Sequence, residues 1–134
     1  MSRLLIDLTP ETRALASKFL ADCAEASIDI LVTCTFRSFD EQDALYAKGR
    51  PAGGSIVTWA RGGESPHNYG MAFDVVPIEN GKPIWDASDP IWEVIGAIGT
   101  ADGLDWGGNF PPGKKDVPHF QRPGWKNYIG VSHV

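Results

Sequence analysis

The sequence of 134 residues contains no long apolar run. A helix that spans a bilayer needs about 20 consecutive apolar residues, and no segment approaches that length. The opening segment Met1–Asp7 reaches an acidic side chain before the apolar core of a secretion signal could form. We therefore expect a protein that is synthesised in the cytoplasm without a signal peptide and that does not insert into a membrane.

Cysteines and clustered basic residues are also scarce. The two cysteines, Cys23 and Cys34, do not form a C-x-x-C pair, and they fall in a predicted helix and a predicted strand. We interpret both as buried free thiols, in preference to a disulfide or a catalytic thiol. The formal net charge is -5 and the basic residues are scattered along the chain. Because binding to a phosphate backbone needs a concentrated cationic face, no nucleic acid is expected as a partner.

The composition that remains is that of an ordinary globular protein, with 43% hydrophobic and 22% charged residues. A chain of this length can bury a core of its own without disulfides. No repeat and no change of composition marks a boundary along the chain. We therefore expect one domain over residues 1–134, acting as a monomer.

The periodicity of apolar residues predicts alternating helices and strands. Thr9-Pro10-Glu11 is typical of a helix start, and Ser38 with Glu41 matches a capping box. The predicted helices cover residues 10–26, 38–49 and 90–103, and the predicted strands cover residues 28–37, 71–76, 104–108 and 117–121. A Gly-, Pro- and Ser-rich surface loop over 50–66 is typical of a segment that contacts substrate. The buried face of the third helix is predicted to consist of Ile91, Val94, Ile95 and Ile98.

Two separated segments carry the side chains of a metal site. His67 and Asp74 stand seven residues apart across Gly70, and His119 lies far downstream. A carboxylate within an apolar strand is costly unless it is paired or coordinated, which favours coordination by Asp74. Zinc hydrolases use three protein ligands and leave a fourth position for water. Zinc lowers the pKa of that water from 15.7 to about 7, so these three residues predict a zinc hydrolase.

Asp116, three residues before His119, is the candidate general base that later protonates the leaving amine. Asp105 remains a rival second carboxylate near the site. Taken alone, His67 is interpreted as a histidine of a surface loop and His119 as a hydrogen-bonded core residue. The combination of the segments favours metal ligation. His133 lies one residue from the chain end and is not favoured as a ligand.

These residues resemble a known family, the metallopeptidases that comprise D-alanyl-D-alanine carboxypeptidases and phage L-alanyl-D-glutamate endopeptidases. The matching motifs are Ser65-x-His67-x-x-Gly70-x-Ala72-x-Asp74, then Trp106-Gly107-Gly108, then Asp116-x-Pro118-His119-Phe120. The resemblance implies zinc ligands at His67, Asp74 and His119, and a catalytic acid/base at Asp116. It also implies that Arg37 holds a carboxylate of the substrate and that Ser65 adds a hydrogen bond.

The resemblance implies an α+β, hedgehog/DD-peptidase-like fold, in which a small antiparallel sheet carries the zinc site and helices pack on its other side. It implies a peptidase that acts on bacterial peptidoglycan after release to the cell wall. The carboxypeptidase branch places a glutamate and a tryptophan before the last histidine, where this chain has Asp116-Val117-Pro118. This favours cleavage of the L-alanyl-D-glutamate bond by a phage or prophage endolysin. The alternatives are a D-alanyl-D-alanine carboxypeptidase and a non-catalytic, zinc-stabilised binding module of the same fold.

Overall fold

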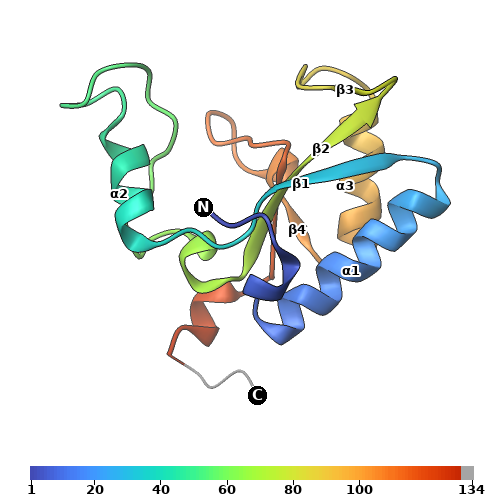
Figure 1. The fold of residues 1–134 in the computed structure, drawn as a ribbon, viewed down its shortest axis with the longest axis horizontal. Helices are drawn as coiled ribbons and strands as arrows, with labels where there is room; N and C mark the ends of the chain where they lie inside the picture. The colour runs from blue at the N-terminus through green and yellow to red at the C-terminus, as the bar shows by residue number, and fades with distance from the viewer. Residues whose placement is uncertain (131–134) are drawn as a thin grey trace.

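The computed structural model of the protein describes residues 1–130. Its α-helices are α1 (Pro10–Glu25), α2 (Phe39–Ala47) and α3 (Ile91–Ala101). Its strands are β1 (Asp29–Cys34), β2 (Ala72–Glu79), β3 (Lys82–Pro83), β4 (Asp105–Trp106) and β5 (His119–Gln121). Short 3-10 helices are η1 (Leu5–Asp7), η2 (Pro66–Tyr69), η3 (Gly107–Asn109) and η4 (Trp125–Tyr128). Helices α1 and α3 lie side by side against the sheet, while α2 stands apart from them (Figure 1).

The strands form one antiparallel sheet in the order β1-β2-β5-β4, with β3 paired to β2 in a hairpin. Strand β2 is central, and its residue Asp74 lies opposite Cys34 on one neighbouring strand and opposite His119 on the other. Because side chains alternate between the two faces of a strand, a slip of one residue would turn Asp74 to the wrong face. The register of β2 therefore decides whether a site can form. The α+β fold with a small antiparallel sheet is confirmed.

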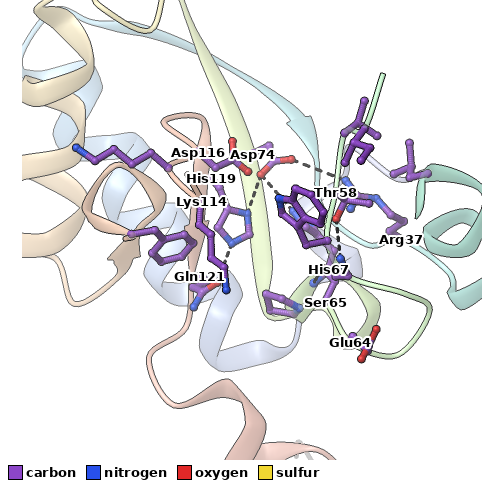
Figure 2. Close-up of a pocket in the computed structure, with 18 of the residues that line it drawn as sticks. Arg37, Thr58, Glu64, Ser65, His67, Asp74, Lys114, Asp116, His119 and Gln121 are labelled. Atoms are coloured by element: carbon purple, nitrogen blue, oxygen red, sulfur yellow. Dashed lines mark hydrogen bonds and ion pairs between the residues drawn. The ribbon is translucent and has the colours of Figure 1, made fainter. Parts of the chain in front are cut away.

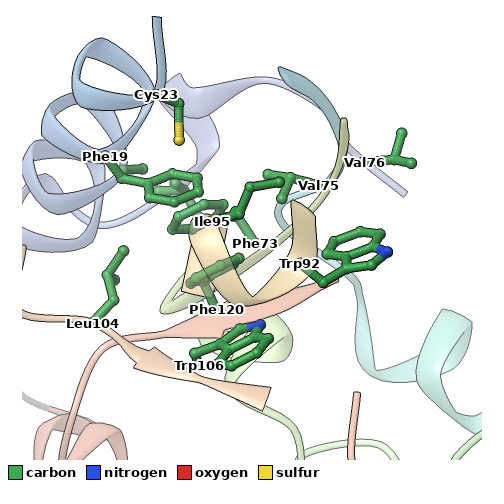
Figure 3. Close-up of a cluster of buried hydrophobic side chains, with 12 residues drawn as sticks. Phe19, Cys23, Phe73, Val75, Val76, Trp92, Ile95, Leu104, Trp106 and Phe120 are labelled. Carbon is green, nitrogen blue, oxygen red and sulfur yellow. The ribbon is translucent and has the colours of Figure 1, made fainter. Parts of the chain in front are cut away.

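The core lies between the sheet and the helices α1 and α3 (Figure 3). Its centre is a group of three aromatic rings, Phe19 of α1, Phe73 of β2 and Phe120 of β5. The ring of Phe120 lies 4.6 Å from that of Phe19 and 5.8 Å from that of Phe73. Burial of each such side chain stabilises the fold by about 1.5–3 kcal/mol. Since Phe73 faces the helices, its neighbour Asp74 faces the other side of the sheet.

The start of α2 follows the predicted capping box. The Ser38 hydroxyl accepts a hydrogen bond from the Glu41 backbone N–H, and the Glu41 carboxylate accepts one from the Ser38 backbone N–H, at 3.0 and 2.9 Å. The chain then leaves α2 as an irregular segment that returns to η2, so the predicted long loop is confirmed. The η2 turn itself was not predicted.

Helix α3 packs through a face that overlaps the predicted one, because Ile95 is fully buried and Ile91 and Ile98 pack against the core, but Val94 does not belong to it. Trp92 is 1% exposed, whereas Val94 is 49% exposed. The buried positions of this helix also include Gly96 and Gly99, which lie against the rings of Trp106 and Phe120. Because these glycines have no side chain, the two aromatic rings can pack close to the helix axis. The face of α3 that carries the glycines and Trp92 therefore packs against the core. The prediction for Val94 was wrong because two apolar faces compete in this sequence.

Strand β1 is shorter than predicted, because it ends at Cys34 and leaves Arg37 beyond the sheet. Among residues 1–130, no helix combines the length and the apolar character that crossing a membrane requires. Cys23 and Cys34 are both buried and free, as predicted. His133 lies outside the residues that the structure describes.

Candidate active site

The three predicted metal ligands converge on one point of the sheet face opposite α1 and α3 (Figure 2). Asp74 Oδ1 lies 3.1 Å from His67 Nε2 and 3.1 Å from His119 Nδ1. His119 reaches this point because it pairs with Asp74 across β2 and β5. His67 reaches it from η2, where the chain enters β2 through Gly70 in a left-handed conformation, with φ of 66°. The predicted approach of the two distant segments is present in the structure.

The remaining ring nitrogen of His67 is already engaged. Nδ1 lies 2.7 Å from the Thr35 carbonyl oxygen, and because a carbonyl can only accept, Nδ1 carries a proton. The Nε2 atom is then the one available to a metal ion. A histidine ligand of a metal typically donates its other N–H to a carbonyl or carboxylate in this way, which fixes the orientation of the ring.

His119 has the complementary arrangement. Its Nε2 atom lies 2.8 Å from Gln121 Oε1, two residues along β5. With Nε2–H donated to this amide oxygen, Nδ1 is the ring nitrogen that faces Asp74 and is available to a metal ion. Gln121 was not identified in the sequence. Its signal would have been a polar side chain at an i, i+2 position, on the same strand face as a ligand.

The charges of this group are those of a site that can exchange a proton for a cation. Burial alone would lower the pKa of His67, but attraction to Asp74 outweighs it and raises the pKa to about 10. Burial alone would raise the pKa of Asp74, but His67 and a hydrogen bond from His119 hold it well below its usual range. In the metal-free site, the Asp74 carboxylate therefore stabilises a proton on the imidazole of His67. Metal binding displaces such protons, so the donor set of two imidazoles and one carboxylate fits a zinc ion.

A cysteine that the sequence did not connect with the site also reaches it. Ligand atoms of Cys34, His67 and Asp74 lie within 4.8 Å of one another, and they could hold a metal ion. However, Cys34 Sγ lies 3.8 Å from His67 Nδ1, which is the nitrogen that donates to the Thr35 carbonyl. The Nε2 atom, free for a metal, faces Asp74 instead. The geometry therefore favours His119 over Cys34 as the third ligand.

Arg37 lies beside the ligands, with its guanidinium directed at Asp74. The Nη2 atom lies 3.9 Å from Asp74 Oδ2, and Nη1 donates to Gln42 Oε1 at 2.8 Å. Gln42 is fully buried, and its amide nitrogen also donates to the Ala60 carbonyl at 2.8 Å. The Arg37 carbonyl accepts from the side chain of Asn68 at 2.9 Å. Buried amides thus fix Arg37 at both its backbone and its head group, and neither was predicted.

Ser65 is the N-cap residue of η2 and is buried. Its hydroxyl accepts a hydrogen bond from the backbone N–H of His67 at 3.2 Å, and its own N–H donates to Asn68 Oδ1 at 3.2 Å. These bonds form a capping box around η2. A hydroxyl that accepts one bond can still donate its hydrogen, so Ser65 keeps a donor for a ligand.

Asp116 stands on the segment that leads into β5. Its N–H donates to the Gly107 carbonyl at 3.0 Å, and its carbonyl accepts from the His119 N–H at 3.1 Å. Desolvation at the cleft raises the pKa of its carboxyl, and the negative charge of Asp74 raises it further. A carboxylate with a raised pKa is a stronger base.

All six side chains predicted for the site line a single cleft of about 1010 Å³. They are Arg37, Ser65, His67, Asp74, Asp116 and His119. One wall of the cleft comes from the long loop, where Trp59 is 65% exposed. Asp105, the rival carboxylate, belongs to a different and smaller pocket beside Trp106. The arrangement joins a metal site, a base and a cationic anchor within one open cleft.

Known proteins resemble this chain in sequence and in fold. Residues 59–122 match the profile of a family described as D-alanyl-D-alanine carboxypeptidase. The chain is 42% identical over 125 residues to the peptidoglycan L-alanyl-D-glutamate endopeptidase CwlK of Bacillus subtilis, a match that covers 86% of this chain and 73% of that protein.

Two solved structures share the fold. The L-Ala D-Glu endopeptidase ChiX of Serratia marcescens superposes with a TM-score of 0.69 at 23% identity, over 92% of this chain and 86% of that chain. The vancomycin resistance D,D-pentapeptidase VanY in complex with Zn(II) superposes with a TM-score of 0.65 at 14% identity, over 95% of this chain and 79% of that chain.

Proposed function

Because the chain belongs to the peptidase family that contains D-alanyl-D-alanine carboxypeptidases and the endopeptidase CwlK, we propose that it is a zinc peptidase that hydrolyses the L-alanyl-D-glutamate bond of peptidoglycan stem peptides. The observation that carries the proposal is the convergence of metal ligands, base and anchor in one cleft. The 42% identity to an enzyme named for this bond supports the choice of substrate. All six residues come from one chain, so a monomer suffices.

His67 through Nε2, Asp74 through its carboxylate and His119 through Nδ1 would hold the zinc ion. The hydrogen bonds of the opposite ring nitrogens to the Thr35 carbonyl and to Gln121 keep both imidazoles in the required orientation. Zinc in such a site supplies Lewis acidity, which polarises the carbonyl under attack and makes water acidic enough to lose a proton near neutral pH.

Arg37 and Ser65 position the substrate in this proposal. The D-glutamyl residue is linked through its side chain and therefore keeps a free α-carboxylate. A guanidinium can bind such a carboxylate through two parallel hydrogen bonds, and the Ser65 hydroxyl can donate a third. Because Gln42 holds the guanidinium in place, the anchor is ordered before the substrate arrives. Pre-ordered anchors reduce the entropic cost of orienting the scissile bond.

Asp116 carries the proton. It accepts a proton from the water that attacks the L-alanyl carbonyl carbon, as the new carbon–oxygen bond forms. It then gives this proton to the nitrogen of D-glutamate as the carbon–nitrogen bond breaks. The products are a C-terminal L-alanyl carboxylate and a free amine on D-glutamate. General acid–base catalysis of this kind contributes typically 10²- to 10⁴-fold.

The test is a mass-spectrometric analysis of muropeptides after digestion of purified peptidoglycan by the zinc-loaded protein. We expect fragments that begin with D-glutamate, and we expect Asp116→Ala to retain zinc while losing activity by about 10²- to 10⁴-fold. Release of D-alanine alone would instead identify a carboxypeptidase. If no fragment appears although zinc is bound, the protein is a binding module. Full activity of Asp116→Ala would remove Asp116 from the mechanism.

We extend the proposal to a lytic role, as a phage or prophage endolysin. Cleavage between L-alanine and D-glutamate leaves L-alanine on the glycan and detaches the rest of the stem peptide, which releases the cross-links that this peptide carries. Removal of a terminal residue leaves existing cross-links in place. The zinc-loaded protein should therefore clear a suspension of Gram-negative cells whose outer membrane has been permeabilised, and Asp116→Ala should not. A turbidity that stays constant with active protein would contradict this role.

A further inference from the structure

Three lysines from two segments of the chain line the same cleft. Lys114 and Lys115 precede Asp116, and Lys126 lies in η4 beyond β5. We call these three residues the lysine wall. They are half of the six lysines of the chain, and all three line the cleft that holds the proposed active site. The fold therefore concentrates positive charge at a point where the sequence shows no basic cluster.

This concentration stands out against the charge of the molecule. The cleft lining contains the lysine wall and Arg37, against the carboxylates of Glu64, Asp74 and Asp116, whereas the whole chain has a formal charge of -5. Asp74 is engaged with two histidines, and Glu64 accepts the backbone N–H of Arg61 at 2.8 Å. Two of the three acidic groups are thus already occupied.

The lysine wall itself has no ion-pair partner within residues 1–130. Lys18, by contrast, lies 3.0 Å from Asp22 and 3.4 Å from Asp102. Lys18 has a role in joining α1 to the end of α3. Because the cleft lysines have no such role among the described residues, their charge is available to a ligand.

The position of Lys114 is set by the backbone. Its N–H donates to the Pro111 carbonyl at 2.9 Å, which closes a turn through Gly113. Figure 2 shows the Lys114 side chain running along the cleft beside His119 and Gln121, while Arg37 lies on the opposite side of the metal ligands. A ligand that spans the metal ligands therefore meets Arg37 at one side and Lys114 at the other, within a cleft that Lys115 and Lys126 also line.

We propose that the lysine wall binds a second carboxylate of the substrate, located on the third residue of the stem peptide. This inference rests on the function proposed above, in which Arg37 takes the α-carboxylate of D-glutamate. Stem peptides differ at the third residue, which carries a free carboxylate when it is diaminopimelate and none when that group is amidated. The enzyme thus selects stem peptides by charge as well as by the bond that it cuts.

The test compares two peptides that differ by one charge. They are N-acetyl-L-alanyl-γ-D-glutamyl-diaminopimelate and the same peptide with the distal carboxylate of diaminopimelate converted to a carboxamide. For the zinc-loaded full chain, we expect kcat/KM to be higher for the carboxylate peptide, through a lower KM. Exposed ion pairs contribute about two- to fivefold each, so the preference should be on the order of tenfold. It should shrink at high salt, since salt screens exposed charges.

The variant Lys114→Gln, Lys115→Gln, Lys126→Gln should bring the ratio of the two kcat/KM values toward one. Lys82→Gln is the matched control, because Lys82 is an exposed lysine of the β3 hairpin outside the cleft. An equal kcat/KM of the wild-type protein for the two peptides would overturn the inference. A preference that survives in the triple variant would also overturn it.

Calorimetric binding of the same peptides separates this inference from the proposed function. If neither peptide is cut, the proposed bond is wrong, and the binding ratio then tests the lysine wall alone. If the wild-type protein binds the carboxylate peptide more tightly and the triple variant does not, the lysine wall binds the second carboxylate. Equal binding of both peptides by the wild-type protein refutes it.

Discussion

Gly107→Ala should separate the position of Asp116 from its chemistry. Gly107 packs directly against the segment that carries the proposed base. A Cβ at this position would overlap the Asp116 carbonyl oxygen and would lie 3.0 Å from the Asp116 carbonyl carbon and 3.1 Å from His119 Cβ. Ordinary van der Waals contact begins at 3.4 Å. The segment must therefore move away, and the Gly107–Asp116 hydrogen bond of 3.0 Å must lengthen.

The displacement needed to relieve the overlap is on the order of 1 Å, and a misplacement of this size can reduce the rate by about 10²-fold. Overpacking typically costs about 1–3 kcal/mol of stability, so the domain should remain folded. We expect kcat for the carboxylate peptide to fall by about 10²-fold while the chain still binds zinc. The assay is steady-state kinetics on protein whose folded fraction and zinc content have been measured.

Gly81→Ala is the matched control. Gly81 has a φ of 74° at the tip of the β2–β3 hairpin, and an added Cβ there would meet no atom within 4 Å. Its backbone strain costs about 1–3 kcal/mol, a loss of stability similar to that of Gly107→Ala, but it cannot displace the cleft. A wild-type kcat in Gly107→Ala, or an equal loss of activity in both variants, would show that the position of Asp116 does not limit the rate.

Two further predictions concern buried groups. Gln42→Leu removes the acceptor of Arg37 Nη1 and leaves the Ala60 carbonyl unpaired. Since a hydrogen bond to a charged group contributes about 1.5–3 kcal/mol, KM should rise at least tenfold with little change in kcat. An unchanged KM in steady-state kinetics would contradict the role of Gln42 in positioning Arg37. Burial raises the pKa of the Cys23 thiol from 9.0 to about 11, so the folded state keeps a proton that the unfolded chain loses above pH 9. The stability from this thiol is complete below about pH 9 and is lost as the pH rises through about 11. In urea unfolding, the difference in free energy of unfolding between the wild-type protein and Cys23→Ala should therefore shrink on the order of 1 kcal/mol over this pH range. A difference that does not change with pH would contradict this.

The parts of the fold that depend on neighbouring residues could be predicted from the sequence. The capping box of Ser38 and Glu41 is one example, because both hydrogen bonds lie within one turn. Asp74 is another, because a carboxylate in an apolar strand requires a partner wherever the strand packs. Both predictions rest on physics that acts within a few residues of the chain.

Contacts between distant segments could not be predicted in the same way. Cys34 lies opposite Asp74 only because the pairing of β1 and β2 shifts between Val32 and Cys34, and no local pattern fixes that shift. The exposure of Val94 and the burial of Trp92 depend on which apolar face of α3 meets the sheet. The lysine wall likewise exists only once η4 has folded beside the cleft.

Zinc content measures directly whether His67, Asp74 and His119 hold the metal. Each variant is loaded with zinc and dialysed, and the bound metal is counted per folded chain. We expect about one zinc in the wild-type protein and in Cys34→Ser, and a strong loss in Asp74→Asn and His119→Ala. Retention of zinc by His119→Ala together with its loss from Cys34→Ser would contradict metal ligation by His119, because the thiolate would then be the third ligand.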